Sequence, residues 1–498
     1  MKMAENGVNG HKSGVMEWKV GFMNNTEKYL TAETFGFKVN ASGVALKKKQ
    51  IWTIEQEQDH DFVYIRSSLG RYMKSDKYGT VTVDTEAEEK GEDAKFTVEY
   101  SKDGQWAFRH VERGNYLSGT DDIVKCFEKT PTSNSWWSIQ LYIHPQIHLR
   151  NVNRKRYAHL NNDTNELECT ELIPWGADAL VFLDFVKGKY VLKSCDNRFL
   201  NRDGSLQEAI DNNALFMMEI HSGALAFKDC EGRYLTAVGK GTMKGRNKNI
   251  SKDELFTIED SHPQVQIVSH NGKSVSVKQG VDVSANQPAE EIEDTEIFQI
   301  EHNRASDTWA LLASTNKYWS LQSAGTVQAK TAETEGAKSF FTIEWQEDGT
   351  VGIKGSDGKY LSNKQTGILF SAGTTLEPTD LFRITIINRP LLVLKSEFGF
   401  VGAKGNQFIC SKAKYDSLTL QSAGSGLYTI QGTDGKYWSV GEDTLVYGDA
   451  TGTKFQFQFC GGSMMAIRTH KGPFLKGEQN GLLKACAPDL ESATLWEF

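Results

Sequence analysis

Two short clusters of basic residues stand out in this sequence. The first is Lys47-Lys48-Lys49, directly before an expected strand at Ile51, and the second is Arg154-Lys155-Arg156. Like charges at this density repel one another, and a polyanionic partner would relieve that repulsion. The chemistry open to these residues is therefore the binding of an acidic surface, with ordinary solvated charge as the alternative for either cluster. Neither cluster has the interleaved aromatic residues typical of single-stranded nucleic-acid binding.

No set of residues with catalytic or metal-binding spacing accompanies these clusters. The sequence has no glycine-rich nucleotide loop and no His-Glu-x-x-His pattern. Its eleven histidines are scattered, whereas a general base needs positioned partners. The acidic run 290–294 lacks the ligand spacing of a calcium loop, so we interpret it as a solvated loop. We therefore expect no catalytic residue, no metal and no cofactor, and the chain is not predicted to be an enzyme.

Composition indicates a cytoplasmic protein of several domains. The 498 residues exceed the size of a single hydrophobic core. A formal net charge of −8 argues against a general nucleic-acid binder. The seven cysteines include no Cys-x-x-Cys pair, which favours free thiols in a reducing compartment. We find neither a signal peptide nor an apolar run of about eighteen residues, so no insertion into a membrane is expected.

The basic clusters lie in a chain built from twelve copies of one unit of roughly forty residues. One signature is a turn residue, usually a basic residue, an aromatic residue and an apolar residue. Its ring positions are Tyr29, Tyr72, Tyr116, Tyr157, Phe199, Tyr234, Tyr318, Tyr360, Phe400, Tyr437 and Phe474, and Ser274 replaces the ring in one copy. The second signature is an aromatic residue followed by alternating apolar residues, which indicates strands with one buried face. We expect the ring of the first signature to enter the core while the basic residue leans along the surface.

Prolines divide the repeats into groups of three. Pro145, Pro263 and Pro390 are each followed by a new apolar strand, and each interval holds three repeats. Three repeats are typical of a β-trefoil, whereas a propeller closes on about four to eight blades and usually carries signatures absent here. We therefore predict an all-β fold of four tandem β-trefoil domains. Their expected limits are 18–144, 145–263, 264–388 and 389–498, after a mobile arm of residues 1–17.

Several longer motifs resemble the fascin family. They are Lys28–Ser42, Leu46–Gln50, Arg154–Leu160, Lys252–Phe256, Val283–Gln287, Ile387–Pro390 and Leu495–Phe498. The similarity runs from about Trp18 to the end and keeps the order of the motifs. The resemblance implies four tandem β-trefoils in a monomer that cross-links actin filaments into tight parallel bundles, in the actin cytoskeleton of cell projections.

A monomer can bridge two filaments only if it has at least two separate binding surfaces. Because filamentous actin is acidic, we expect the two basic clusters and Lys28 to form one surface. The resemblance implies that other surfaces draw on single charges in the third and fourth trefoils. The candidate actin-binding residues are Lys28, Lys47, Lys48, Lys49, Arg154, Lys155, Arg156, Lys364, Arg389, Lys404 and Lys476.

The family resemblance also implies regulation by phosphorylation next to the first cluster. In the family, a serine close before the Leu-Lys-Lys-Lys run is a target of protein kinase C, and phosphate there weakens actin binding. Here Ala45 precedes Leu46, and the nearest hydroxyl belongs to Ser42. A phosphate adds about −2 charge, which would cancel much of the lysine field. Ser42 is the candidate phosphorylation site, and loss of this switch is the alternative.

A carbohydrate-binding lectin is the second interpretation, since many trefoils bind sugars. The Gln-x-Trp pattern common in such lectins fits one copy of the repeat, at Gln50-Ile51-Trp52. An enzyme is the least favoured class, because no spaced catalytic set is present. The fold alone does not choose among these classes, since function depends on particular sites.

Overall fold

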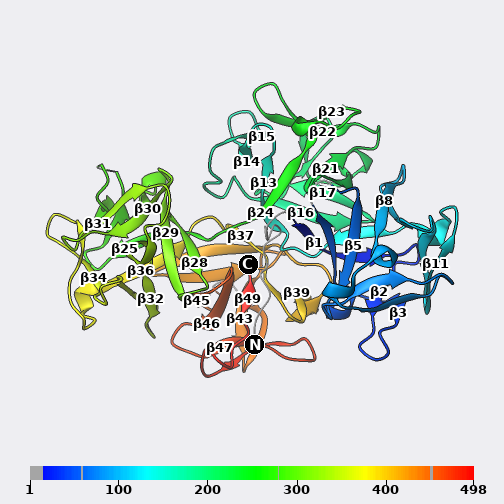
Figure 1. The fold of residues 1–498 in the computed structure, drawn as a ribbon. Helices are drawn as coiled ribbons and strands as arrows, with labels where there is room; N and C mark the ends of the chain where they lie inside the picture. Colours follow the sequence, from blue (N-terminus) through cyan, green and yellow to red (C-terminus); the bar gives the residue numbers. More distant parts are fainter. Residues whose placement is uncertain (1–14, 58–59, 279, 449–451) are drawn as a thin grey trace. The chain divides into compact units, whose positions relative to one another are not determined.

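The computed structural model describes residues 15–57, 60–278, 280–448 and 452–498. The chain forms two compact units, Met1–Leu172 with Val181–Asp260, and Ile173–Leu180 with Ser261–Phe498. Within the described residues, secondary structure consists of β-strands and short 3₁₀ turns (Figure 1). A search of the same residues finds no helix with the length and apolar character needed to cross a membrane.

The strands of the first unit fall into two sets of twelve. The first set is β1 Val15–Met23, β2 Tyr29–Ala32, β3 Val39–Gly43, β4 Trp52–Glu57, β5 Phe62–Ser67, β6 Tyr72–Ser75, β7 Val81–Thr85, β8 Phe96–Tyr100, β9 Trp106–His110, β10 Tyr116–Thr120, β11 Ile123–Glu128 and β12 Ser138–Leu141. The second set is β13 Gln146–Asn151, β14 Arg156–Asn161, β15 Glu166–Glu171, β16 Val181–Val186, β17 Lys189–Lys193, β18 Phe199–Leu200, β19 Leu206–Gln207, β20 Met217–His221, β21 Ala224–Lys228, β22 Tyr234–Val238, β23 Thr242–Asn247 and β24 Phe256–Asp260.

The second unit repeats this order. Its first set is β25 Gln264–Ser269, β26 Lys273–Ser276, β27 Ser284–Pro288, β28 Ile297–Asn303, β29 Thr308–Ala313, β30 Lys317–Leu321, β31 Val327–Thr331, β32 Thr342–Trp345, β33 Val351–Lys354, β34 Leu361–Asn363, β35 Leu369–Ser371 and β36 Leu381–Ile386. Its second set is β37 Leu391–Leu392, β38 Lys395–Ser396, β39 Gly399–Lys404, β40 Gln407–Lys412, β41 Leu418–Gly424, β42 Leu427–Gln431, β43 Tyr437–Gly441, β44 Thr444–Gly448, β45 Phe455–Cys460, β46 Met464–Thr469, β47 Phe474–Gly477, β48 Leu483–Ala487 and β49 Trp496–Glu497.

Strand pairing closes each set into a barrel. In the first set, β1 pairs with β4, β4 with β5, β5 with β8 and β8 with β9. A bridge from Trp106 to Trp137 and the pairing of β12 with β1 complete the circle. The remaining strands form the hairpins β2–β3, β6–β7 and β10–β11, which bridges from Lys38 to Thr82 and from Thr80 to Lys125 join together. A closed barrel with three joined hairpins is a β-trefoil.

The other three sets close in the same way. In the second, β13, β16, β17, β20, β21 and β24 form the circle, with a bridge from Tyr190 to Phe216. In the third, β25, β28, β29, β32, β33 and β36 do so, with a bridge from Trp309 to Phe341. In the fourth, β37 and β38 follow each other with two residues between them and together take the place of the first strand. β37 pairs with β41, and the path continues through β42, β45, β46 and β49 back to β38. The predicted all-β fold of four tandem β-trefoils is confirmed.

The structure changes two details of the predicted domain limits, which otherwise stay a proposal. Residues 1–14 of the expected arm lie outside the described residues, but strand β1 already begins at Val15, and Val15 pairs with Glu57. The segment Ile173–Leu180 falls within the predicted second domain, yet it is part of the second unit. There Trp175 packs with Ile297, and the Gly176 N–H donates to Gln264 Oε1 at 2.8 Å.

The signature rings do not enter the barrel cores as predicted. The fully buried residue of the main core is instead the apolar one that follows, as with Met73 after Tyr72 and Leu235 after Tyr234. Tyr72 and Tyr234 pack in separate small clusters outside that core. The reason is that successive residues of a strand point to opposite faces, so one of the pair must leave the core.

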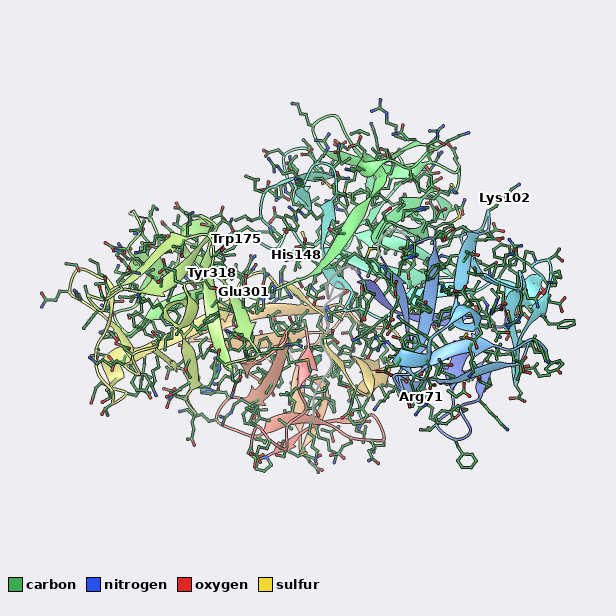
Figure 2. All side chains as sticks on the ribbon, in the orientation of Figure 1. Arg71, Lys102, His148, Trp175, Glu301 and Tyr318 are labelled. Carbon is green, nitrogen blue, oxygen red and sulfur yellow. The ribbon has the colours of Figure 1, made fainter. Side chains whose placement is uncertain are left out.

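These tyrosines instead donate their hydroxyls to carboxylates on earlier barrel strands. Tyr72 donates to Glu55 at 2.8 Å, and Tyr318 donates to Glu301 at 2.9 Å. Figure 2 labels Tyr318 and Glu301. The basic partner of such a pair can also cover the ring, since Lys228 Nζ lies 4.8 Å from the ring centroid of Tyr234. A tyrosine–carboxylate contact therefore recurs along the chain and links one strand of a repeat to the next.

Tyr190 joins the two barrels of the first unit. Its buried hydroxyl accepts a hydrogen bond from the Leu141 N–H and donates one to the Ile139 carbonyl, each at 2.8 Å. In the second unit Tyr428 occupies a similar position, where its hydroxyl accepts from the Ile386 N–H at 2.7 Å. Each unit thus has a polar contact that fixes one barrel against the other.

We expect Tyr190→Phe to lower the free energy of unfolding by about 1–3 kcal/mol, because the Leu141 N–H would stay buried without its acceptor. Urea denaturation followed by circular dichroism measures this change. Tyr78→Phe is the matched control, since Tyr78 is 72% exposed and its loss of a hydroxyl should leave stability unchanged. Equal midpoints for Tyr190→Phe and the control would refute a stabilising role of the hydroxyl.

Candidate functional site

The triple lysine of the first trefoil lies on a short turn anchored by a glutamine. Lys47 precedes the 3₁₀ turn η1 (Lys48–Gln50), and all three lysines are exposed while Gln50 is buried. The Lys47 N–H donates to Gln50 Oε1 at 3.3 Å, and Gln50 Nε2 donates to Thr31 Oγ1 of β2 at 3.0 Å. The glutamine therefore holds the turn against β2 and leaves the lysines in solvent.

Equivalent turns in other repeats have a different charge. They are η3 Glu92–Ala94, η4 Ser133–Ser135, η5 Asn212–Ala214, η6 Lys252–Glu254, η7 Asp294–Glu296, η8 Gly336–Ser339 and η9 Pro378–Asp380, and an additional turn, η2 Ala87–Glu89, precedes η3. The residue before the turn is Asp211, Ser251, Glu293 and Glu377 for η5, η6, η7 and η9. Asp211 and Ser251 accept hydrogen bonds from N–H groups of their turns, and acidic side chains at this position complement the backbone dipole. Lys47 stands at this position before η1 and opposes that preference, so the scaffold does not explain a lysine there.

The charges of this cluster are largely uncompensated. Lys49 Nζ pairs with Glu33 Oε2 at 2.8 Å, whereas Lys47 and Lys48 form no ion pair with any described residue. Lys28 directly precedes β2, the strand that also supports η1 through Thr31, so the structure brings Lys28 and the triple lysine to the same strand. A hydrogen bond from Lys49, with a second from Asn40, holds the pKa of Glu33 below its ordinary value.

Ser42 lies in the same polar network. Its exposed hydroxyl donates to Asn40 Oδ1 at 2.8 Å, and Asn40 Nδ2 donates to Glu33 Oε1 at 3.1 Å. Glu33 in turn accepts from Lys49. A change at the Ser42 hydroxyl can therefore reach the partner of one of the three lysines through two hydrogen bonds.

The second basic cluster is held against a hairpin of the second trefoil. Arg154 Nε donates to the Ala237 carbonyl at 3.0 Å, and Nη2 donates to the Gly239 carbonyl at 2.7 Å. Lys155 is exposed in the turn between β13 and β14, with φ of 54°, and Arg156 begins β14. The structure thus places the cluster beside the tip of the β22–β23 hairpin.

That hairpin and the segment that follows it to η6 have basic residues that the sequence prediction missed. Lys240, Arg246, Lys248 and Lys252 are exposed, and Lys244 is half-buried. We call these five residues, together with Arg154, Lys155 and Arg156, the trefoil-2 basic surface. None of the eight forms an ion pair with a described residue, although the acidic strand β15 pairs with the start of β23. The sequence did contain a signal for this surface, because five cations lie between positions 240 and 252. Other residues, among them glycine and asparagine, separate these cations, so no contiguous basic run appears.

The predicted residues of the second unit are single charges on different hairpins. Lys364 is exposed at the end of β34, with Nζ 5.6 Å from the ring centroid of Phe370. Lys404 is exposed at the end of β39, and Lys476 is half-buried in β47 opposite Lys484. These positions form no cluster comparable with the two of the first unit.

The prediction that Arg389 lies on an exposed surface is wrong. It is 1% exposed, and its Nη2 donates to Ser261 Oγ at 2.7 Å while Nη1 donates to the Asn388 carbonyl at 3.2 Å. Burial lowers the pKa of its guanidinium to about 9. The guanidinium is therefore enclosed and hydrogen-bonded within its own unit, and it presents no charge at the surface.

The acidic run 290–294 ends in an ordinary turn. Glu293 precedes η7 and pairs with Lys278 at 2.8 Å. In the part of the chain that the structure describes, no group of three or more histidine, cysteine, aspartate or glutamate side chains is placed to hold a metal ion.

Fold and surfaces together define a protein of four β-trefoils with exposed basic surfaces in its first unit. A family model described as the fascin domain matches residues 26–139, 147–258, 270–384 and 399–498. Fascin-2 of Bos taurus is 40% identical over 491 residues, which cover 97% of this chain and 98% of the relative. Fascin of Strongylocentrotus purpuratus is 36% identical over 504 residues, which cover 97% and 99%. The chain belongs to the fascin family.

Proposed function

We propose that this protein cross-links actin filaments into tight parallel bundles and has no catalytic activity. The observation that carries the proposal is the concentration of cations at Lys47–Lys48 and on the trefoil-2 basic surface, where none of them pairs with a carboxylate in the described part of the chain. Filamentous actin is acidic, so such surfaces complement it and speed its binding. Membership of the fascin family supports actin as the acidic partner rather than nucleic acid.

A cross-linker that acts as a monomer needs at least two separate surfaces. We propose the first unit as the source of one surface, formed by Lys28, the triple lysine and the trefoil-2 basic surface. Lys364, Lys404 and Lys476 are the candidates for a further surface in the second unit. Buried contacts such as those of Tyr190 and Tyr428 keep the trefoils within each unit rigid, which suits a cross-link of fixed length. The expected location is the cytoplasmic actin cytoskeleton, in bundles of cell projections.

Sedimentation of actin filaments with the full chain tests this function. We expect filaments to pellet at low speed only when the protein is present, which reports bundling. High-speed pelleting reports binding alone, and filaments or protein centrifuged separately provide the controls. Both signals should fall as salt rises, because the screening length shrinks from about 10 Å at 0.1 M to about 3 Å at 1 M. Filaments that stay in the low-speed supernatant at low salt would refute bundling.

We also propose that phosphorylation of Ser42 weakens the binding of filaments to the surface that includes the triple lysine. The hydroxyl is exposed and connected through Asn40 and Glu33 to Lys49. A phosphate there would add about −2 charge beside the triple lysine.

A further inference from the structure

Ser251 lies at the junction of the trefoil-2 basic surface. It is exposed and follows the β22–β23 hairpin, immediately before η6. Lys248 stands three residues before it, Arg246 five residues before it and Lys252 directly after it. A hydroxyl with basic residues at these positions suits a kinase whose substrate groove is acidic, because each cation can pair with a carboxylate of the groove.

The Ser251 hydroxyl is bonded to a carboxylate inside the protein. Glu254 is fully buried, and its Oε2 accepts from Ser251 Oγ at 2.6 Å and from the Ser251 N–H at 2.8 Å. Its Oε1 accepts from Thr236 Oγ1 of β22 at 2.9 Å and from Asn247 Nδ2 of β23 at 2.7 Å. Burial alone would raise the pKa of Glu254, but the hydrogen bonds, first that from Ser251, lower it. Both strands of the hairpin therefore depend on this carboxylate.

The same turn also holds the loop that carries Arg154. Asn151 Nδ2 donates to the Asp253 carbonyl at 2.9 Å, and the Val152 N–H donates to the Leu255 carbonyl at 2.9 Å. Asn153 Nδ2 donates to Asp253 Oδ1 at 2.6 Å. The hairpin, the loop at 151–156 and the turn at Ser251 thus form one hydrogen-bonded assembly that presents all eight cations.

We propose that Ser251 is a phosphorylation site that switches off the trefoil-2 basic surface. In the reaction the Ser251 Oγ–P bond forms, the bond between the γ-phosphorus and its bridging oxygen in ATP breaks, ADP leaves, and the hydroxyl proton passes to the kinase base. The effect on filaments rests on the proposed function, whereas the modification and its effect on the hairpin do not.

Phosphate at Ser251 acts on the surface in two ways. It adds about −2 charge among eight cations, which reduces attraction for an acidic partner. It also removes the hydroxyl proton that Glu254 accepts and sets a dianion next to a buried carboxylate. Repulsion between these anions displaces the turn and releases the hairpin bonds to Thr236 and Asn247.

The experiment treats the full chain with ATP and, as a probe, the catalytic subunit of cyclic-AMP-dependent protein kinase. Peptide mass spectrometry measures phosphate at Ser251. Hydrogen exchange measures the protection of backbone amides in residues 234–247. High-speed sedimentation measures affinity for actin filaments. We expect phosphate at Ser251, faster exchange in the hairpin, and about a tenfold weaker affinity for filaments.

Ser251→Asn is the matched variant, because asparagine can cap the turn but cannot accept this phosphate. After kinase treatment it should keep the exchange rate and filament affinity of the untreated chain. Absence of phosphate at Ser251 would overturn the proposal, and so would phosphate that changes neither exchange nor affinity. If the untreated chain does not bind filaments, the proposed function fails, and the mass and exchange measurements still decide whether Ser251 is a modified switch.

Discussion

Replacing Lys47, Lys48 and Lys49 with glutamate should weaken filament binding through this surface about a hundredfold and abolish bundling. The three exposed lysines lie on one turn, and Lys47 and Lys48 have no described carboxylate partner that would take up the change. An exposed ion pair contributes up to about 1 kcal/mol, so losing three such pairs costs about 3 kcal/mol, or roughly a hundredfold in affinity. The low-speed filament pellet, which reports bundling, should disappear. The amount of protein bound to filaments in the high-speed pellet should fall less, because the other surfaces remain.

The control for this variant carries the same change of net charge on dispersed lysines. Lys102, Lys338 and Lys414 are all exposed, and Figure 2 labels Lys102. Glutamate at these three positions should leave bundling intact. Circular dichroism should show both triple variants folded, since η1 is anchored by Gln50 rather than by its lysines. If the two variants lose bundling equally, net charge and not this turn governs the interaction.

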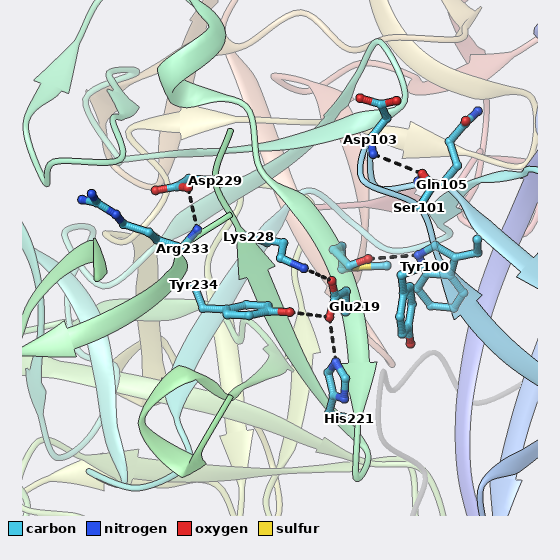
Figure 3. A network of polar contacts seen from close by, with 12 residues as sticks. Tyr100, Ser101, Asp103, Gln105, Glu219, His221, Lys228, Asp229, Arg233 and Tyr234 are labelled. Carbon is cyan, nitrogen blue, oxygen red and sulfur yellow. Dashed lines mark hydrogen bonds and ion pairs between the residues drawn. The ribbon is translucent and has the colours of Figure 1, made fainter. Parts of the chain in front are cut away.

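Glu219→Ala should lower the free energy of unfolding by about 1–3 kcal/mol, because it removes the hydrogen-bond acceptor of Tyr234 and of the partly exposed Lys228 and His221. Glu219 is 4% exposed and accepts hydrogen bonds from Lys228 at 3.0 Å, from Tyr234 at 2.9 Å and from His221 at 2.9 Å (Figure 3). Urea denaturation at neutral pH measures the loss. Glu208→Ala is the control, since Glu208 is exposed and its removal should change stability little.

The stabilising effect of Glu219 should also depend on pH. Burial alone would raise the pKa of this carboxyl, but the hydrogen bonds from His221, Lys228 and Tyr234 outweigh burial and lower it. A folded-state pKa below the unfolded value of about 4.3 means that the stabilisation is complete above that pH and is lost as pH falls through the folded pKa. The stability gap between the natural chain and Glu219→Gln should therefore shrink on acidification below about pH 5. A gap that stays constant down to pH 3 would contradict this charge-based account.

Sequence alone determined the fold class and the position of the triple lysine. Period-two alternation in twelve repeats specifies strands with one buried face, and the grouping in threes specifies closed trefoils, because both patterns can be read along the chain. The triple lysine was also visible, since its three charges are contiguous. The signature ring was misplaced because alternation shows that two faces exist but does not show which of two apolar neighbours, such as Tyr72 and Met73, takes the core.

Tertiary structure decided what depends on contacts between distant segments. Arg389 looks like any basic residue in the sequence, and only the packing of its unit encloses it against Ser261. The trefoil-2 basic surface exists because Arg154 is hydrogen-bonded to Ala237, eighty-three positions away. Ser251 gains its importance from Glu254, whose carboxylate connects the two strands of a hairpin to the turn. Charge and hydrophobic period can be read along the chain. Burial and hydrogen bonding between distant residues arise only when separate segments come together. These contacts decide which charges remain free to bind a partner.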